Sequence, residues 1–86
     1  MAKLTQCEKI LKAMLENPDK ERWYASDFQG GKYFVGYEAS ARMSDLLRLY
    51  PFLFNIEQDG RFRTMGINWK NNKKVIKALK KELEIR

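Results

Sequence analysis

The chain has 86 residues, of which 44% are hydrophobic and 33% charged, the composition of one folded domain with a single modest core. Its net charge is +6, and residues 68–86 hold seven basic and two acidic residues, so the basic excess favours an acidic partner such as nucleic acid. No apolar run is long enough for a membrane span or a signal peptide, and the lone cysteine, Cys7, excludes an intrachain disulfide, so we expect a cytoplasmic protein without membrane contact.

The first predicted element is an amphipathic helix. Thr5 and Glu8 have the spacing of a capping box, in which each side chain accepts a hydrogen bond from the other residue's backbone amide. The apolar residues of one helical face follow at Cys7, Ile10, Leu11, Met14 and Leu15. Asn17-Pro18 ends the pattern, because the residue before a proline is driven out of the helical region. We predict a helix over about residues 6–16.

Two short elements and a connector follow. Residues 23–25 (Trp-Tyr-Ala) favour a brief strand, and Ser26 is a suitable N-cap for a short helix with Asp27 at its positive end. Gly30-Gly31 end that helix within a few residues. Residues 32–36 then form a connector that we expect to bury one or two aromatic side chains.

Residues 37–49 are the strongest helical segment after the first, and Pro51 ends it. On a helical wheel the inward side gathers Ala39, Met43, Leu46, Leu47 and Tyr50. The opposite side, with Ser40 at its flank, carries Tyr37, Ala41, Ser44 and Arg48. A third stripe holds Glu38, Arg42 and Asp45 at spacings that favour ion pairs between Arg42 and both carboxylates.

Residues 52–67 predict a β-hairpin, because apolar and polar residues alternate on both sides of a turn signal at Asp59-Gly60. On the returning strand, Arg61 and Arg63 share one face. We expect Phe62, on the other face, to point toward the core.

Asn71 or Asn72 begins a last helix over about residues 73–83. Its apolar side consists of Asn72, Val75, Ile76, Leu79 and Leu83. Its opposite side consists of Lys73, Lys74, Lys77, Lys80 and Lys81. The apolar side either packs on the domain or pairs with a second copy. The lysine side is either a solvated face or a phosphate-binding one.

The residues that common catalytic sites need are missing. The chain has no histidine and one cysteine, which excludes the usual zinc sites and a cysteine–histidine nucleophile. Gly30-Gly31 belongs to no phosphate-binding glycine motif. We therefore expect no enzyme, no cofactor, no metal and no small-molecule substrate.

Three stretches resemble small winged-helix proteins of bacteria and their phages: residues 23–28 (WYASDF), 35–46 (VGYEASARMSDL) and 59–63 (DGRFR). In that family a Tyr-x-Ala-x-x-Arg-x-Ser-Glu/Asp-Leu segment begins the second helix of the helix-turn-helix, and a Gly-Arg wing tip follows. The resemblance implies an α+β fold, a winged helix-turn-helix whose three-helix core and β-hairpin wing span about residues 5–67. A basic amphipathic helix at about 71–85 is added within one domain over residues 1–86.

The resemblance further implies a DNA-binding protein and transcriptional regulator that binds double-stranded DNA. The helix at 37–49 would enter the major groove, and the wing at 57–63 would reach a phosphate or the minor groove. Winged-helix regulators also dimerise through a terminal helix, so a homodimer through the last helix is a second implication. The residues expected to contact DNA are Lys32, Tyr37, Ser40, Ser44, Arg48, Arg61, Arg63, Lys73, Lys77 and Lys80.

The alternative is a protein-interaction module, because winged helices also serve as adaptors and a fold does not fix a function. The exposed apolar patch of such an adaptor would come from Tyr33, Phe34, Tyr37, Leu49 and Leu53. A continuous positive surface joining Arg48, the wing arginines and the lysine helix favours DNA. A neutral aromatic patch favours a partner protein.

Overall fold

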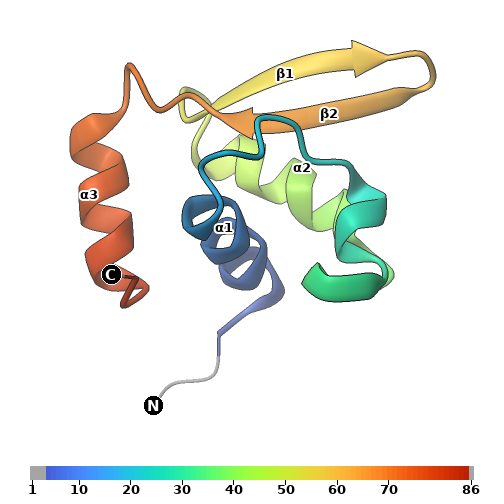
Figure 1. Ribbon diagram of the computed structural model, residues 1–86, viewed down its shortest axis with the longest axis horizontal. Helices are drawn as coiled ribbons and strands as arrows, with labels where there is room; N and C mark the ends of the chain where they lie inside the picture. Colours follow the sequence, from blue (N-terminus) through green and yellow to red (C-terminus); the bar gives the residue numbers. More distant parts are fainter. Residues whose placement is uncertain (1–3, 86) are drawn as a thin grey trace.

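The computed structural model describes residues 4–85 and has an α+β architecture compatible with the expected winged helix (Figure 1). Within these residues three α-helices accompany one antiparallel hairpin: α1 (Gln6–Glu16), α2 (Ala39–Leu49), β1 (Phe54–Asp59), β2 (Phe62–Ile67) and α3 (Lys73–Glu82). Two short 3-10 helices lie between α1 and α2: η1 (Ala25–Phe28) and η2 (Gly31–Tyr33). No helix in this part of the chain has the length and apolar character needed to cross a membrane.

The predicted capping box at the start of α1 is confirmed. The Glu8 amide donates to Thr5 Oγ1 at 3.2 Å, and the Thr5 amide donates to Glu8 Oε1 at 3.0 Å. The helix has the predicted bounds and buries Ile10, Leu11, Met14 and Leu15, while Cys7 is half-buried against the core. The local signals around α1 were therefore sufficient to define it.

The brief strand expected at residues 23–25 is reduced to a single bridge. The Trp23 amide donates to the Met65 carbonyl at 2.7 Å, and the Met65 amide donates back to the Trp23 carbonyl at 3.0 Å. Trp23 is 1% exposed and stacks on Phe28 with ring centroids 5.2 Å apart. This bridge ties the segment after α1 to the base of the hairpin.

The prediction that Ser26 caps a short helix is wrong. Ser26 lies inside η1, and the capping bond belongs to Asp27, whose carboxylate accepts the Tyr24 amide hydrogen at 2.8 Å. In the connector Tyr33 is half-buried against Trp23, with centroids 5.0 Å apart, whereas Phe34 is 52% exposed.

The second helix begins at Ala39 rather than Tyr37, because Tyr37 and Glu38 form a turn before it. The Tyr37 carbonyl accepts a hydrogen bond from Gln29 Nε2 at 3.2 Å, which holds that turn against the end of η1. The predicted inward side is confirmed: Ala39, Met43 and Leu46 are buried, and Leu47 and Tyr50 are half-buried.

The hairpin forms as predicted, with its loop one residue further along. Asp59 pairs with Phe62, so Gly60 and Arg61 make a two-residue loop. Gly60 has φ +59°, which a glycine at the first loop position adopts without strain.

The expected inward orientation of Phe62 is wrong, because this side chain is 66% exposed. The physical reason is the register of β2: Met65 and Ile67 contact the core, and Phe62, which alternates with them, lies on the opposite face, near the projecting tip of the hairpin (Figure 1). On β1 only Phe54 is buried, and on β2 the buried residues are the last four, from Thr64 to Ile67.

The last helix packs on the domain through Ile76, Leu79 and Leu83, and it lies beside α1 (Figure 1). Val75, predicted on the same apolar side, is 44% exposed, because it lies at the edge of the contact rather than within it. Asn72 precedes the helix without capping it by its side chain. Its Nδ2 donates instead to the carbonyls of Phe52 and Asn68, both at 2.9 Å.

Candidate functional site

The outward side of α2 and the hairpin are joined by a direct side-chain contact. Arg63 Nη2 donates to Ser44 Oγ at 2.8 Å, and Ser44 Oγ donates to the Ser40 carbonyl at 3.2 Å. Arg48 lies one helical turn beyond Ser44 on the same side of α2, and its side chain is 79% exposed. The structure therefore brings together residues of the predicted helix and wing that are far apart in sequence.

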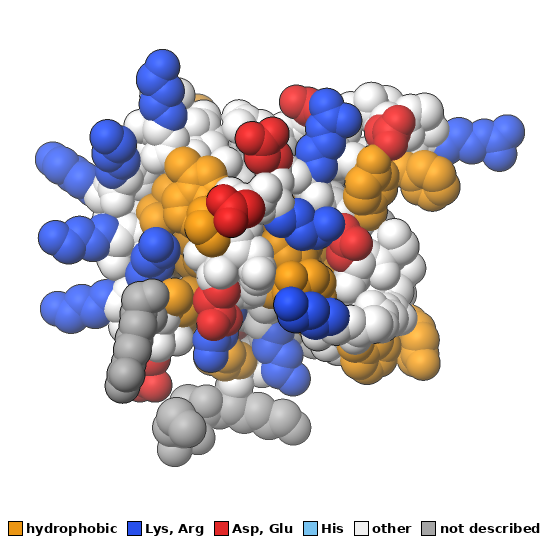
Figure 2. Space-filling model, viewed as in Figure 1, with side chains coloured by type: hydrophobic (Ala, Val, Ile, Leu, Met, Phe, Trp, Pro, Cys, Tyr) orange, Lys and Arg blue, Asp and Glu red, His pale blue; other side chains and the backbone are white. Residues whose placement is uncertain are grey.

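A hollow of about 490 Å³, which we call the wing groove, lies between the hairpin tip, η1 and α2. Its lining residues are Tyr24, Ala25, Ser26, Gln29, Ser40, Met43, Arg61, Phe62 and Arg63. The rings of Tyr24 and Phe62 meet edge to face, with centroids 6.5 Å apart. Figure 2 shows hydrophobic and basic side chains together at the end of the molecule where the hairpin projects.

Sequence reasoning missed Tyr24, Gln29 and Phe62 as members of this groove. The prediction placed Phe62 on the core side of the strand, but Met65 and Ile67 contact the core and Phe62 alternates with them, so it lies on the opposite face. The sequence signal for its exposure is its place directly beside the turn, where Asp59 pairs with Phe62. Tyr24 and Gln29 had no signal of their own, because they reach the groove through packing of η1.

One carboxylate lies between two arginines on α2. Asp45 Oδ2 is 3.0 Å from Arg42 Nε, and Asp45 Oδ1 is 2.6 Å from Arg48 Nη2. The predicted Arg42–Asp45 pair is confirmed, whereas the predicted Glu38–Arg42 pair is wrong, because within residues 4–85 no cation lies within 4.0 Å of Glu38. The charge that Arg48 presents is thus partly compensated.

The acidic residues of the hairpin are engaged elsewhere. Glu57 forms an ion pair with Arg22, and Asp59 accepts a hydrogen bond from the Tyr24 hydroxyl, which raises the pKa of Tyr24. In the described part of the chain, neither Arg61 nor Arg63 has a carboxylate within 4.0 Å. The wing therefore presents two arginines without an ionic partner there.

Two further predicted residues lie outside the wing groove. Lys32 is on η2, with its ammonium 5.4 Å from the centroid of the Tyr33 ring, and it lines a hollow shared with α1. Tyr37 is 82% exposed and meets Phe34 edge to face, with centroids 5.5 Å apart.

The predicted lysines of the last helix belong to another region. Lys73, Lys77 and Lys80 line a hollow on α3, and Figure 1 shows α3 and the hairpin tip at opposite ends of the molecule. On the face shown in Figure 2, basic side chains gather over α3, and acidic side chains lie between them and the hairpin end. On that face the positive surface is not continuous.

The apolar patch expected of an adaptor is present only in part. Phe34, Tyr37 and Leu49 are exposed, but Tyr33 is half-buried. The inclusion of Leu53 is wrong, since it is 2% exposed and belongs to the core. Phe52, which was not predicted, is 82% exposed.

Among residues 4–85, no three His, Cys, Asp or Glu side chains gather closely enough to hold a metal ion. Compared with protein-family models, with curated proteins and with solved structures, the chain matches none of them.

Proposed function

We propose that this is a winged-helix DNA-binding protein and a transcriptional regulator, with α2 as its recognition helix and the β1–β2 hairpin as its wing. The observation that carries the proposal is the contact between Arg63 and Ser44. It holds an arginine-bearing hairpin beside the exposed side of a helix, which is the arrangement that groove binding requires.

The residues of this ridge have the chemistry that duplex DNA needs. Arg48 has the two-pronged donor that a guanine edge accepts in the major groove. The hydroxyls of Ser40 and Ser44 suit phosphate oxygens, which position a protein without specifying sequence. Arg61, at the wing tip, suits a neighbouring phosphate or the minor groove.

The affinity of this ridge depends on few charges. Arg48, Arg61 and Arg63 supply three cations, and Asp45 compensates one of them. Each phosphate neutralised changes the slope of log affinity against log salt by about −0.9. We therefore expect a slope of roughly −2 to −3 for the α2–wing contact, shallower than that of a protein with many phosphate contacts.

The test compares two double variants that lose the same charge. R48A/R61A removes the exposed arginines of α2 and the wing, and K9A/K70A removes two exposed lysines that lie outside both. Anisotropy of a labelled random duplex at two salt concentrations should show about tenfold weaker binding for R48A/R61A and a much smaller loss for K9A/K70A. Equal losses in the two variants would contradict the proposal.

The second candidate is an adaptor, and one observation favours it. Phe34 and Tyr37 form an exposed aromatic pair ahead of α2, where Arg42 and Arg48 are balanced by Asp45 and by Glu38 just before the helix. If the wild-type protein binds no duplex even at low salt, this candidate replaces DNA binding.

A further inference from the structure

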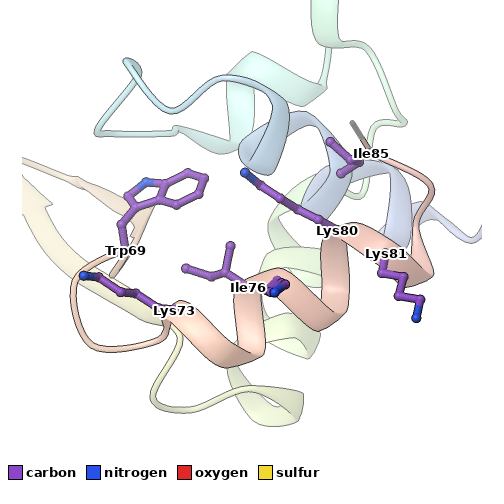
Figure 3. Close-up of a pocket in the computed structure, with 7 residues that line it drawn as sticks. Trp69, Lys73, Ile76, Lys80, Lys81 and Ile85 are labelled. Atoms are coloured by element: carbon purple, nitrogen blue, oxygen red, sulfur yellow. The ribbon is translucent and has the colours of Figure 1, made fainter.

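A second hollow, of about 540 Å³, lies on α3 at the end of the molecule away from the wing, and we call it the α3 groove (Figure 3). Its floor is apolar and consists of Trp69, Ile76 and Ile85. Its rim consists of Lys73, Lys77, Lys80 and Lys81. No part of the proposed DNA contact through α2 and the wing uses the floor residues.

The floor is shaped by residues from two segments. Trp69 precedes α3 and is half-buried, whereas Ile76 lies on α3 and is 5% exposed. Figure 3 shows both side chains facing the same hollow, with the Lys80 side chain extended toward the indole. The Lys80 ammonium is 5.4 Å from the centroid of the Trp69 ring, so a cation already covers one side of that ring.

The rim carries charge that the chain does not compensate. Within residues 4–85, no carboxylate lies within 4.0 Å of any of the four rim lysines. Glu84 lines an adjoining hollow that also includes Lys80 and Ile85, but it forms no ion pair there. Like charges on neighbouring turns repel one another, so an anionic occupant relieves this repulsion.

Three occupants fit this chemistry poorly. A second copy docked through the same groove would bring lysines against lysines, and the apolar side of α3 that a dimer would use is buried in the domain. Duplex DNA supplies phosphates, but its apolar groups, such as the thymine methyl, are small and lie inside its grooves. Single-stranded nucleic acid stacks its bases on a series of aromatic rings, and this groove has one, partly covered by Lys80.

We propose that the α3 groove binds an acidic peptide segment of a partner protein. One large apolar side chain of that segment rests mainly against the half-buried Trp69, since only 5% of Ile76 is exposed. Aspartate or glutamate side chains on either side of it pair with the rim lysines. Because the wing lies at the other end of the molecule, the α3 groove and the proposed DNA contact are separate surfaces, and either proposal can fail alone.

The probe is a fluorescein-labelled peptide with a central leucine flanked by glutamates, compared with the same peptide carrying serine in place of leucine. We expect the leucine peptide to bind at low salt and the serine peptide to bind about tenfold more weakly, because it lacks the apolar anchor. Binding should also protect Trp69 from acrylamide quenching, whereas Trp23, at 1% exposure, contributes little to that change.

Matched variants separate the groove from general charge. K73Q/K77Q removes two rim lysines, and K70Q/K74Q removes two exposed lysines beside the groove that do not line it. We expect K73Q/K77Q to bind the leucine peptide about fivefold more weakly and K70Q/K74Q to change binding by less than about twofold. Circular dichroism and thermal unfolding of both variants check that the fold is unchanged.

Several results would overturn the proposal. They are no binding of the leucine peptide at low salt, equal binding of the serine peptide, or equal losses in the two lysine pairs. A single-stranded oligonucleotide that displaces the peptide and depends more strongly on Lys73 and Lys77 would assign the groove to nucleic acid instead. Normal duplex binding by K73Q/K77Q alongside lost peptide binding would support two separate sites.

Discussion

The Arg63 guanidinium donates a hydrogen bond to the Ser44 hydroxyl across 2.8 Å, from the second strand of the wing to the middle of α2. The two residues are 19 positions apart in the chain, and both lie at the surface. The contact uses a donor of Arg63 that would otherwise face solvent. Because the contact is exposed, we expect it to add little to the stability of the fold and to act mainly on the angle between the wing and α2.

A double-mutant cycle with S44A and R63A tests this coupling. Because the contact is exposed, we expect a coupling energy in urea unfolding below about 1 kcal/mol. The effects of S44A and R63A on duplex affinity should not be additive, because each variant alone already removes the contact between the wing and α2. S40A is the control for coupling: it can weaken duplex binding by itself, but its effect should add to that of R63A, because Ser40 contributes only its backbone carbonyl to this contact. Additive effects of S44A and R63A on duplex affinity would show that the contact does not position the wing.

Asp45 should weaken duplex binding in the wild type. The D45N variant removes the carboxylate that is 2.6 Å from Arg48, so we expect affinity to rise about threefold at low salt and the gain to fade at high salt. E38Q removes a negative charge from the same side of α2 without releasing an arginine, and its gain should be smaller. Anisotropy measures both, and an unchanged or weaker affinity of D45N would contradict the expected compensation.

Gly66 should not tolerate a side chain. A Cβ atom at this position would collide with the backbone carbonyl oxygen of Glu21, and neither backbone segment can move without breaking the Trp23–Met65 bridge. We expect G66A to destabilise the protein by about 3 kcal/mol or to prevent folding. A Cβ atom at Gly30 meets nothing within 4 Å, so G30A should stay within about 0.5 kcal/mol of the wild type in urea unfolding. Similar midpoints for the two variants would show that the hairpin base adapts.

The capping box should make stability depend on pH on the acid side. The Thr5 amide, by donating to the Glu8 carboxylate, lowers the pKa of Glu8 below its ordinary 4.5. A carboxyl whose pKa is lower in the folded state stabilises the folded protein at pH values above the ordinary pKa of that carboxyl. This stabilisation is lost as the pH falls through the pKa of the folded state. E8Q should therefore lose stability at neutral pH and differ little from the wild type in strong acid.

Thermal unfolding across this range measures the effect. The control is E21Q, because Glu21 is exposed and makes no ion pair or side-chain hydrogen bond within the described residues. If the E8Q and wild-type stability curves run parallel down to strong acid, the carboxylate does not contribute to the cap.

The candidate sites were predictable to different degrees. The outward side of α2 followed from helical periodicity, and the turn signal placed two arginines at the wing. The prediction that both lie on a strand face away from the core is wrong, because Arg61 lies in the loop and Arg63 shares the face of Met65 and Ile67. That Arg63 reaches Ser44 could not be predicted, because no sequence pattern specifies the angle between a hairpin and a helix. The α3 groove could not be predicted either, because Trp69 and Ile76 line the same hollow only after the chain turns back into α3.

The amino-acid sequence by itself determined the helices and the hairpin, because capping bonds, proline, a glycine turn and apolar periodicity act between residues that are close along the chain. Only the tertiary structure decided which apolar side chains were covered. Val75 has the inward-facing spacing but remains exposed at the edge of α3, whereas Phe62 lies on the face of β2 opposite to Met65 and Ile67, which contact the core. Burial depends on how far each element extends over its neighbours, and that extent is set by contacts between distant segments.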